Sequence, residues 1–89
     1  MVTKQTPLNK LADMAQQATR EVDNEEKFRV KDLFRGFEWN RVAKGNRTKL
    51  GAMFLAHVTS GGIPGVAPEK NSDGSLKKTP QNQQIYIKL

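Results

Sequence analysis

The side chains best suited to chemistry in this sequence are its cations. Seven basic residues and only two acidic ones lie between residues 29 and 49, and further lysines lie in the last third of the chain. Lys and Arg bind phosphates and release the counterions around them, so this pattern predicts a polyanionic partner. The expected phosphate contacts are Arg41, Lys44, Arg47, Lys70, Lys77 and Lys78.

The same sequence offers no constellation for catalysis. His57 is the only histidine and there is no cysteine, so neither the three protein ligands of a catalytic metal nor a thiolate zinc site can be assembled. The sequence also lacks a nucleophile motif, a phosphate-cradling glycine loop and paired carboxylates. We therefore expect no enzyme, no cofactor and no metal, and we expect His57 to be a hydrogen-bonded residue of the core.

Charge is unevenly distributed over a chain that has room for one domain. The 89 residues carry a net charge of +6. Residues 1–27 hold four basic and five acidic side chains, whereas residues 28–89 hold eleven basic and four acidic ones. We expect an N-terminal arm over 1–27 and one basic domain over 28–89. The alternative is that the basic charge of this small protein serves no sequence-specific purpose.

The arm contains one amphipathic pattern. Thr6 and Pro7 are typical of the start of a helix, and apolar residues then recur every three or four positions up to Val22. This pattern predicts a helix over 7–22 with a thin, alanine-rich stripe. Three alternatives stay open, because the stripe can pack on the domain, pair with its copy in a homodimer, or form only in part.

The basic domain begins with several short elements. Alternation over 28–30 predicts a short strand, and a short helix is expected to follow and to be interrupted at Gly36. A second short segment is expected to end at Gly45. Asn46 would then be the N-cap of the clearest helix, which covers 47–59.

The C-terminal third predicts a hairpin. Its limbs are expected near 66–70 and 84–89, and its tip contains Asp73 and Gly74, a dipeptide that favours tight turns. Successive side chains of a strand point to opposite faces. In the return limb we expect one set to face the core and the other to face outward, namely Ile85, Ile87 and Leu89 against Tyr86 and Lys88.

The helix over 47–59 has two faces at about 100° per residue. The expected core face consists of Leu50, Met53, Phe54, His57 and Val58. The opposite face is small and weakly polar, so it either enters a nucleic-acid groove or packs against another helix, such as the N-terminal one. In the first case the residues that read bases would be Thr48, Lys49, Ala52 and Thr59.

Four aromatic residues admit two interpretations. They lie among cations, as stacking platforms for single-stranded bases do. In so small a protein, however, the core needs their apolar area. We therefore expect them inside the domain, the four being Phe28, Phe34, Phe37 and Trp39.

The order of these elements resembles the winged helix-turn-helix family of DNA-binding domains. The fold class is then α+β, mainly helical, with three helices, a C-terminal two-stranded wing and an N-terminal helical arm. The resemblance implies that the helix over 47–59 enters the major groove and that the hairpin over 66–89 runs along the adjacent backbone or minor groove. With Gly45 as the turn glycine, Gly51 stands where the motif usually has a β-branched residue.

A second resemblance is to a family of small uncharacterised proteins found mostly in Gram-positive bacteria and their mobile elements. It rests on a run of residues that covers about two thirds of the chain and implies no activity. The run consists of Phe28, Val30, Asp32, Leu33, Phe34, Gly36, Trp39, Arg47, Leu50, Gly51, Phe54 and Val58.

Together these patterns predict a small cytoplasmic protein that binds double-stranded DNA as a regulator or accessory factor of a bacterial or mobile-element genome. A homodimer through the N-terminal helix is a further expectation, and no membrane contact is expected because no apolar run approaches the length of a span. The alternative function is a protein-interaction module of winged-helix shape that docks a host or self partner without binding DNA. RNA is disfavoured because no aromatic-bearing sheet motif is visible.

Overall fold

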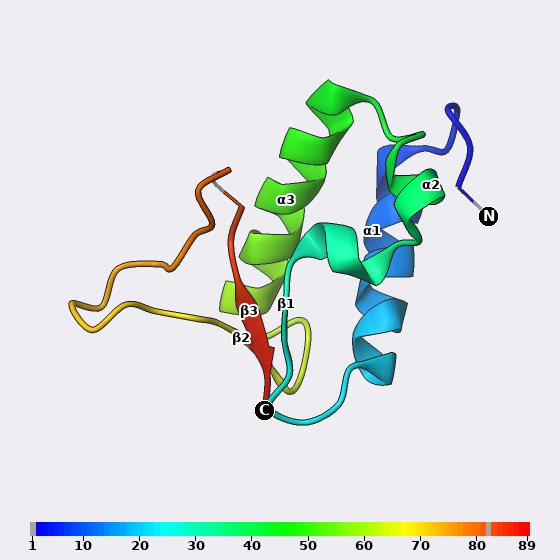
Figure 1. Ribbon diagram of the computed structural model, residues 1–89. Coiled ribbons are helices and arrows are strands. Elements are labelled where there is room, and N and C mark those ends of the chain that lie inside the picture. The colour runs from blue at the N-terminus through cyan, green and yellow to red at the C-terminus, as the bar shows by residue number, and fades with distance from the viewer. Residues whose placement is uncertain (1, 82) are drawn as a thin grey trace.

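A computed structural model describes residues 2–81 and 83–89 of the chain (Figure 1). The protein is α+β, with more helix than strand, as the sequence predicts. No helix in the described residues is both long enough and apolar enough to cross a membrane. The elements in chain order are α1 (Leu8–Ala18), the 3-10 helix η1 (Thr19–Glu21), β1 (Lys27–Phe28), the 3-10 helix η2 (Val30–Leu33), α2 (Gly36–Trp39), α3 (Lys44–Thr59), β2 (Val66–Pro68) and β3 (Tyr86–Lys88).

The three strands form one antiparallel sheet in the order β1-β3-β2. Phe28 of β1 and Pro68 of β2 both lie opposite Tyr86 of β3. The predicted two-stranded ribbon therefore has a third strand. A strand has hydrogen-bonding groups along both edges, and β1 pairs with the edge of β3 that β2 leaves free. Residues 66–88 are called the wing below.

Beyond its strands, the wing is held by two successive turns. A bridge between Lys70 and Leu76 closes the tip, where Gly74 has a φ of 87° that favours glycine. A second bridge joins Lys78 to Gln84. The predicted hairpin and its tip are confirmed. In Figure 1 the yellow and orange part of the wing projects away from the helices.

The core lies between the sheet, α1 and α3. The ring of Tyr86 meets the ring of Phe54 edge-on, with 4.9 Å between centroids, and stacks on Phe28 at 5.8 Å. Leu11 and Ala15 of α1 are buried in the same cluster. The N-terminal stripe thus packs on the domain, the first of the three alternatives. A homodimer through α1 stays a prediction, and it would have to use residues outside this buried stripe.

Helix boundaries differ from the predicted ones. The helix expected over 7–22 ends at Ala18 and continues as η1. α3 begins at Lys44, so Gly45 and Asn46 lie in its first turn instead of ending one helix and capping the next. Here no side chain caps the helix start, and Ala43 precedes it in an extended conformation. The preceding turn is held instead by the side chain of Arg47, described below.

The alternation in the last strand is offset by one residue from the prediction. Tyr86 is fully buried, Ile85 and Ile87 are half-buried, and Leu89 is 68% exposed. The prediction that Ile85, Ile87 and Leu89 face the core was therefore wrong. A period of two fixes which residues share a face but not which face is inside. Here the Tyr86 ring joins two phenylalanine rings, a larger apolar contact than isoleucine would make.

Two predictions about buried rings were wrong. His57, expected in the core, is exposed. It lies near the C-terminal end of α3, at the edge of the helix face on which Leu50, Phe54 and Val58 are buried. Phe37 is 48% exposed, because α2 is a single turn and only one of its sides meets the core.

Candidate nucleic-acid interface

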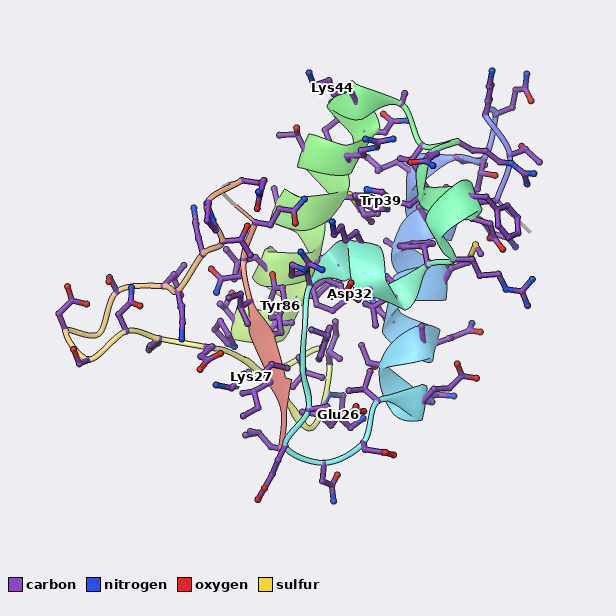
Figure 2. The ribbon with its side chains drawn as sticks, viewed as in Figure 1. Glu26, Lys27, Asp32, Trp39, Lys44 and Tyr86 are labelled. Atoms are coloured by element: carbon purple, nitrogen blue, oxygen red, sulfur yellow. The ribbon has the colours of Figure 1, made fainter. Side chains whose placement is uncertain are left out.

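A groove of about 550 Å³ runs between α3 and the returning part of the wing. Figure 2 shows Lys44 at one end of α3 and Tyr86 lower down, between β3 and the helices. The lining residues are Lys44, Arg47, Thr48, Gly51, Ala52 and Leu55 from α3, Lys78, Gln81, Gln83, Gln84 and Tyr86 from the wing, and Arg29, Val30, Lys31 and Trp39 from the segment before α3.

The lining of the groove is electropositive. Five of its residues are Lys or Arg and none is Asp or Glu. Across residues 2–81 and 83–89, the only ion pairs are Lys27–Glu69, Arg29–Asp32, Arg35–Glu38 and Lys77–Glu69. Lys31, Lys44 and Lys78 therefore bring charges that no carboxylate compensates.

Arg29 contributes less to this potential because its charge is paired. The Asp32 carboxylate accepts two hydrogen bonds of 3.1 Å from the Arg29 guanidinium and one of 2.9 Å from its backbone N–H. Partial burial raises the pKa of Asp32, but these hydrogen bonds outweigh it, so the net pKa lies below its usual value of 3.8. The pair fixes the start of η2 at the side of the groove.

Arg47 lines the groove and also clamps the turn before α3. Its Nε donates to the carbonyl of Val42 at 3.0 Å and its Nη2 donates to the carbonyl of Trp39 at 3.2 Å. The guanidinium lies 5.4 Å from the centroid of the Trp39 ring. Carbonyl groups carry no net charge, so Arg47 adds to the positive potential while two of its five N–H donors are used within the fold.

Arg41, predicted to hold phosphate, lies outside the groove lining. Its Nη1 donates to the carbonyl of Val2 at 2.9 Å, and its guanidinium lies 5.0 Å from the ring centroid of Phe37. Val2 itself is fully buried, and its N–H donates to the Glu38 carboxylate at 3.1 Å. Arg41 and Glu38 thus fasten the N-terminal segment to α2.

The remaining predicted phosphate contacts lie along the wing. Lys78 lines the groove, and Lys70 is exposed just before the tip. Lys77 shares the Glu69 carboxylate with Lys27, at 3.8 and 2.7 Å. The hydrogen bond from Lys27 holds the pKa of Glu69 below its usual range. Of the six predicted phosphate contacts, three line the same groove, namely Lys44, Arg47 and Lys78. The other three, Arg41, Lys70 and Lys77, lie outside its lining.

The residues predicted to read bases lie on two parts of the α3 surface. Thr48 and Ala52 line the groove, whereas Lys49 and Thr59 are exposed away from it. Because Ala52 is exposed, the alternative in which this face packs against the N-terminal helix was wrong. The α1 helix instead packs in the same hydrophobic core as the opposite face of α3, where Leu50 is buried.

The sequence pattern predicts Tyr86 on the outer face of the last strand, whereas the structure buries it among the lining residues of the groove. Its hydroxyl is buried without a hydrogen-bond partner among the described residues, and burial raises its pKa to about 12. The phenol is therefore a neutral hydrogen-bond donor at physiological pH. The one sequence signal for a groove at this place was Gly51, because a glycine in the interior of a helix weakens the helix and calls for a reason.

Fold and site together define a small α+β protein with an electropositive groove beside its longest helix. The chain belongs to the family of the domain of unknown function DUF1413, whose family model matches residues 13–88. The match runs from within α1 to the end of β3 and so includes every side of the groove. No curated protein and no solved structure matches the chain.

Proposed function

We propose that this protein binds double-stranded DNA through α3 and the wing, as a small winged-helix protein that regulates or assists a genome. The observation that carries the proposal is the charge of the groove, where Lys31, Lys44 and Lys78 have no carboxylate partner among the described residues and no lining residue is acidic. Uncompensated cations along one groove are the electrostatic footprint of a phosphate backbone.

The arrangement of elements supports a winged-helix mode of binding. A helix, a short strand, two further helices and a hairpin follow one another, and the first strand pairs with the last. α3 has an exposed side of small residues, which allows close approach to base edges in a major groove. The wing beside it would follow the adjacent backbone.

Each residue takes a separate part in this proposal. Lys44, Lys70 and Lys78 contact phosphates directly. Arg47 adds charge while it holds the turn before α3. Thr48 and Ala52 face the bases, with Ala52 placed to contact a thymine methyl group. Lys49 and Thr59 contact the nucleic acid from the exposed surface of α3 outside the groove.

Salt dependence tests the proposal. The logarithm of the binding constant for duplex DNA should fall linearly with the logarithm of salt, with a slope of about −0.9 per phosphate contacted. Replacing both Lys44 and Lys78 by Gln should make the slope shallower by about 2. Fluorescence anisotropy with a labelled random duplex, measured from low to moderate salt, gives the slope directly.

The matched control replaces Lys4 and Lys10 by Gln, which removes the same charge from the exposed N-terminal part of the chain. This control should weaken binding only slightly and leave the slope near that of the wild type. Equal slopes for both double variants, or binding that does not respond to salt, would contradict the proposal.

One observation favours the alternative of a protein-interaction module. Ala52 and Ala56 are both exposed on α3, and small side chains also permit close contact with a partner helix. This alternative predicts no salt-dependent binding to duplex DNA by a fully folded protein. The anisotropy experiment therefore separates the two functions.

A further inference from the structure

Gly51 lies in the interior of α3 although the fold does not require a glycine there. A methyl group built on its α-carbon would meet no atom within 4 Å other than its chain neighbours and the surrounding backbone of the helix, and its φ is not positive. Glycine in a helix interior is less stable than alanine because it has more conformational freedom to lose. Since Gly51 lines the groove, the missing side chain keeps open a surface that a ligand can approach closely.

Three buried polar atoms of lining residues have no partner among the described residues, namely the Tyr86 hydroxyl and the side-chain oxygens of Gln83 and Gln84. Tyr86 is 0% exposed, and its hydroxyl makes no hydrogen bond. The amide nitrogen of Gln84 donates to the carbonyl groups of Glu69, Lys77 and Ile85, which fixes the orientation of the amide. The Gln84 oxygen is then left without a donor. The Gln83 oxygen is likewise buried without a partner, so the groove offers one unused donor and two unused acceptors.

The walls and rim of the groove differ in character. Val30, Trp39 and Leu55 give it apolar walls, whereas Lys31, Lys44 and Lys78 supply positive charge. Its volume of about 550 Å³ lies in the range of small-molecule sites. A simple inorganic anion would use the lysines but not the apolar walls, the open glycine surface or the buried donor and acceptors.

We propose that this groove binds a single nucleotide, with the base between the apolar walls against Gly51 and the phosphate on the lysines. Tyr86 and Gln84 then contact the polar edge of the base. The inference rests on the proposed function, because the nucleotide can be an unpaired one within a bound nucleic acid. The same chemistry is offered by a free mononucleotide, and the experiment separates the two sources.

The test uses the full chain and three probes. These are a labelled fully paired duplex, the same duplex with one unpaired adenine, and free dAMP. We expect tighter binding of the duplex with the unpaired adenine than of the paired one. Gly51→Ala and Tyr86→Phe should weaken that binding about 5- to 10-fold, as expected for a lost close contact or hydrogen bond. They should weaken binding of the paired duplex by a smaller factor, so that the preference for the unpaired adenine falls.

Thermal unfolding shows whether the variants act on the ligand or on the fold. Gly51→Ala should raise the melting temperature, because alanine favours the helix. Tyr86→Phe should also raise it, because the change removes a buried hydroxyl without a partner. A matched control is Gly36→Ala at the start of α2, outside the groove and also without neighbours within 4 Å. It should not change the binding of any probe.

The outcomes keep this inference separate from the proposed function. Equal binding of both duplexes with no binding of dAMP overturns the nucleotide site, while salt-dependent duplex binding still supports the DNA proposal. An equal loss of paired-duplex binding in Gly51→Ala also overturns it, because the surface would then serve the duplex itself. Binding of dAMP that Gly51→Ala weakens, without binding of either duplex, supports the site with a free nucleotide as its ligand and contradicts the DNA proposal.

Discussion

Arg47 serves the fold and the charge of the groove at once. Lysine would keep the charge, but its ammonium cannot reproduce the planar guanidinium that reaches two carbonyls and packs on Trp39. We expect Arg47→Lys to lower the free energy of unfolding by about 1 to 3 kcal/mol. Urea denaturation measures this change.

The DNA-binding slope of Arg47→Lys should match that of the wild type, since the number of cations is unchanged. Lys44→Arg is the natural control, because Lys44 is exposed at the start of α3 and its side chain makes no hydrogen bond or ion pair within the described residues. It should alter neither stability nor slope. If Arg47→Lys is as stable as the wild type, the guanidinium contacts do not hold the turn.

At the scale of single residues, the sequence could predict which cations gather near α3 but not how each is used. Arg41, Lys44 and Arg47 look alike in a charge pattern. Only the folded chain shows that Arg41 reaches the Val2 carbonyl, Arg47 reaches two carbonyls, and Lys44 stays free. These contacts depend on backbone groups that are distant in the sequence or belong to turns, where side-chain spacing carries no information.

At the scale of elements, η2 depends on one carboxylate. The pKa of Asp32 is lowered in the folded protein, mainly through its hydrogen bonds with Arg29, which prevail over the effect of burial. A lowered pKa in the folded state means that the ionised carboxylate stabilises the fold above the unfolded pKa. This contribution is lost as the pH falls through the folded pKa.

We therefore expect the stability difference between the wild type and Asp32→Asn to be constant near neutral pH and to shrink as the pH falls below about 4. The difference near neutral pH should be about 1 kcal/mol, as for loss of a capping group. Chemical denaturation of the wild type and of Asp32→Asn between about pH 3 and pH 7, a range that spans the ordinary carboxyl pKa, gives the free energy of unfolding of each protein. Parallel curves over this range would show that Asp32 has no special role.

Element types were more predictable than element faces. The apolar positions Leu50, Phe54 and Val58 recur every four residues and correctly predict the core side of α3. The last strand has an equally regular pattern, with Ile85, Ile87 and Leu89 on one face, but this apolar face is not the one that is buried. Which face is inside was decided by the rings of Phe28 and Phe54, which lie far away in the sequence. Local periodicity cannot contain that information.

At the scale of the whole molecule, the wing and the body differ in how they are held. α3 and β3 contribute fully buried side chains to the core, whereas the part of the wing from 70 to 84 is joined by isolated bridges and has no buried residue among those described. Local stability follows the density of buried contacts.

We expect backbone amides of Phe54 and Tyr86 to exchange hydrogen only on global unfolding, and amides near the wing tip to exchange much faster through local opening. Hydrogen exchange followed by NMR or mass spectrometry measures both. Duplex DNA should slow exchange in the wing, because the proposed contacts restrain it. Wing amides that exchange as slowly as those of α3 would show one cooperative unit instead.

The position of β3 in the middle of the sheet has a consequence for how the chain is made. β1 and β2 do not pair with each other, and each finds its partner only in residues 86–88. During synthesis, a chain that has not yet reached Tyr86 carries two unmatched strands and lacks the ring that joins Phe28 to Phe54. Any product shortened before this point has no sheet, so proteolytic quality control can distinguish it from the finished molecule.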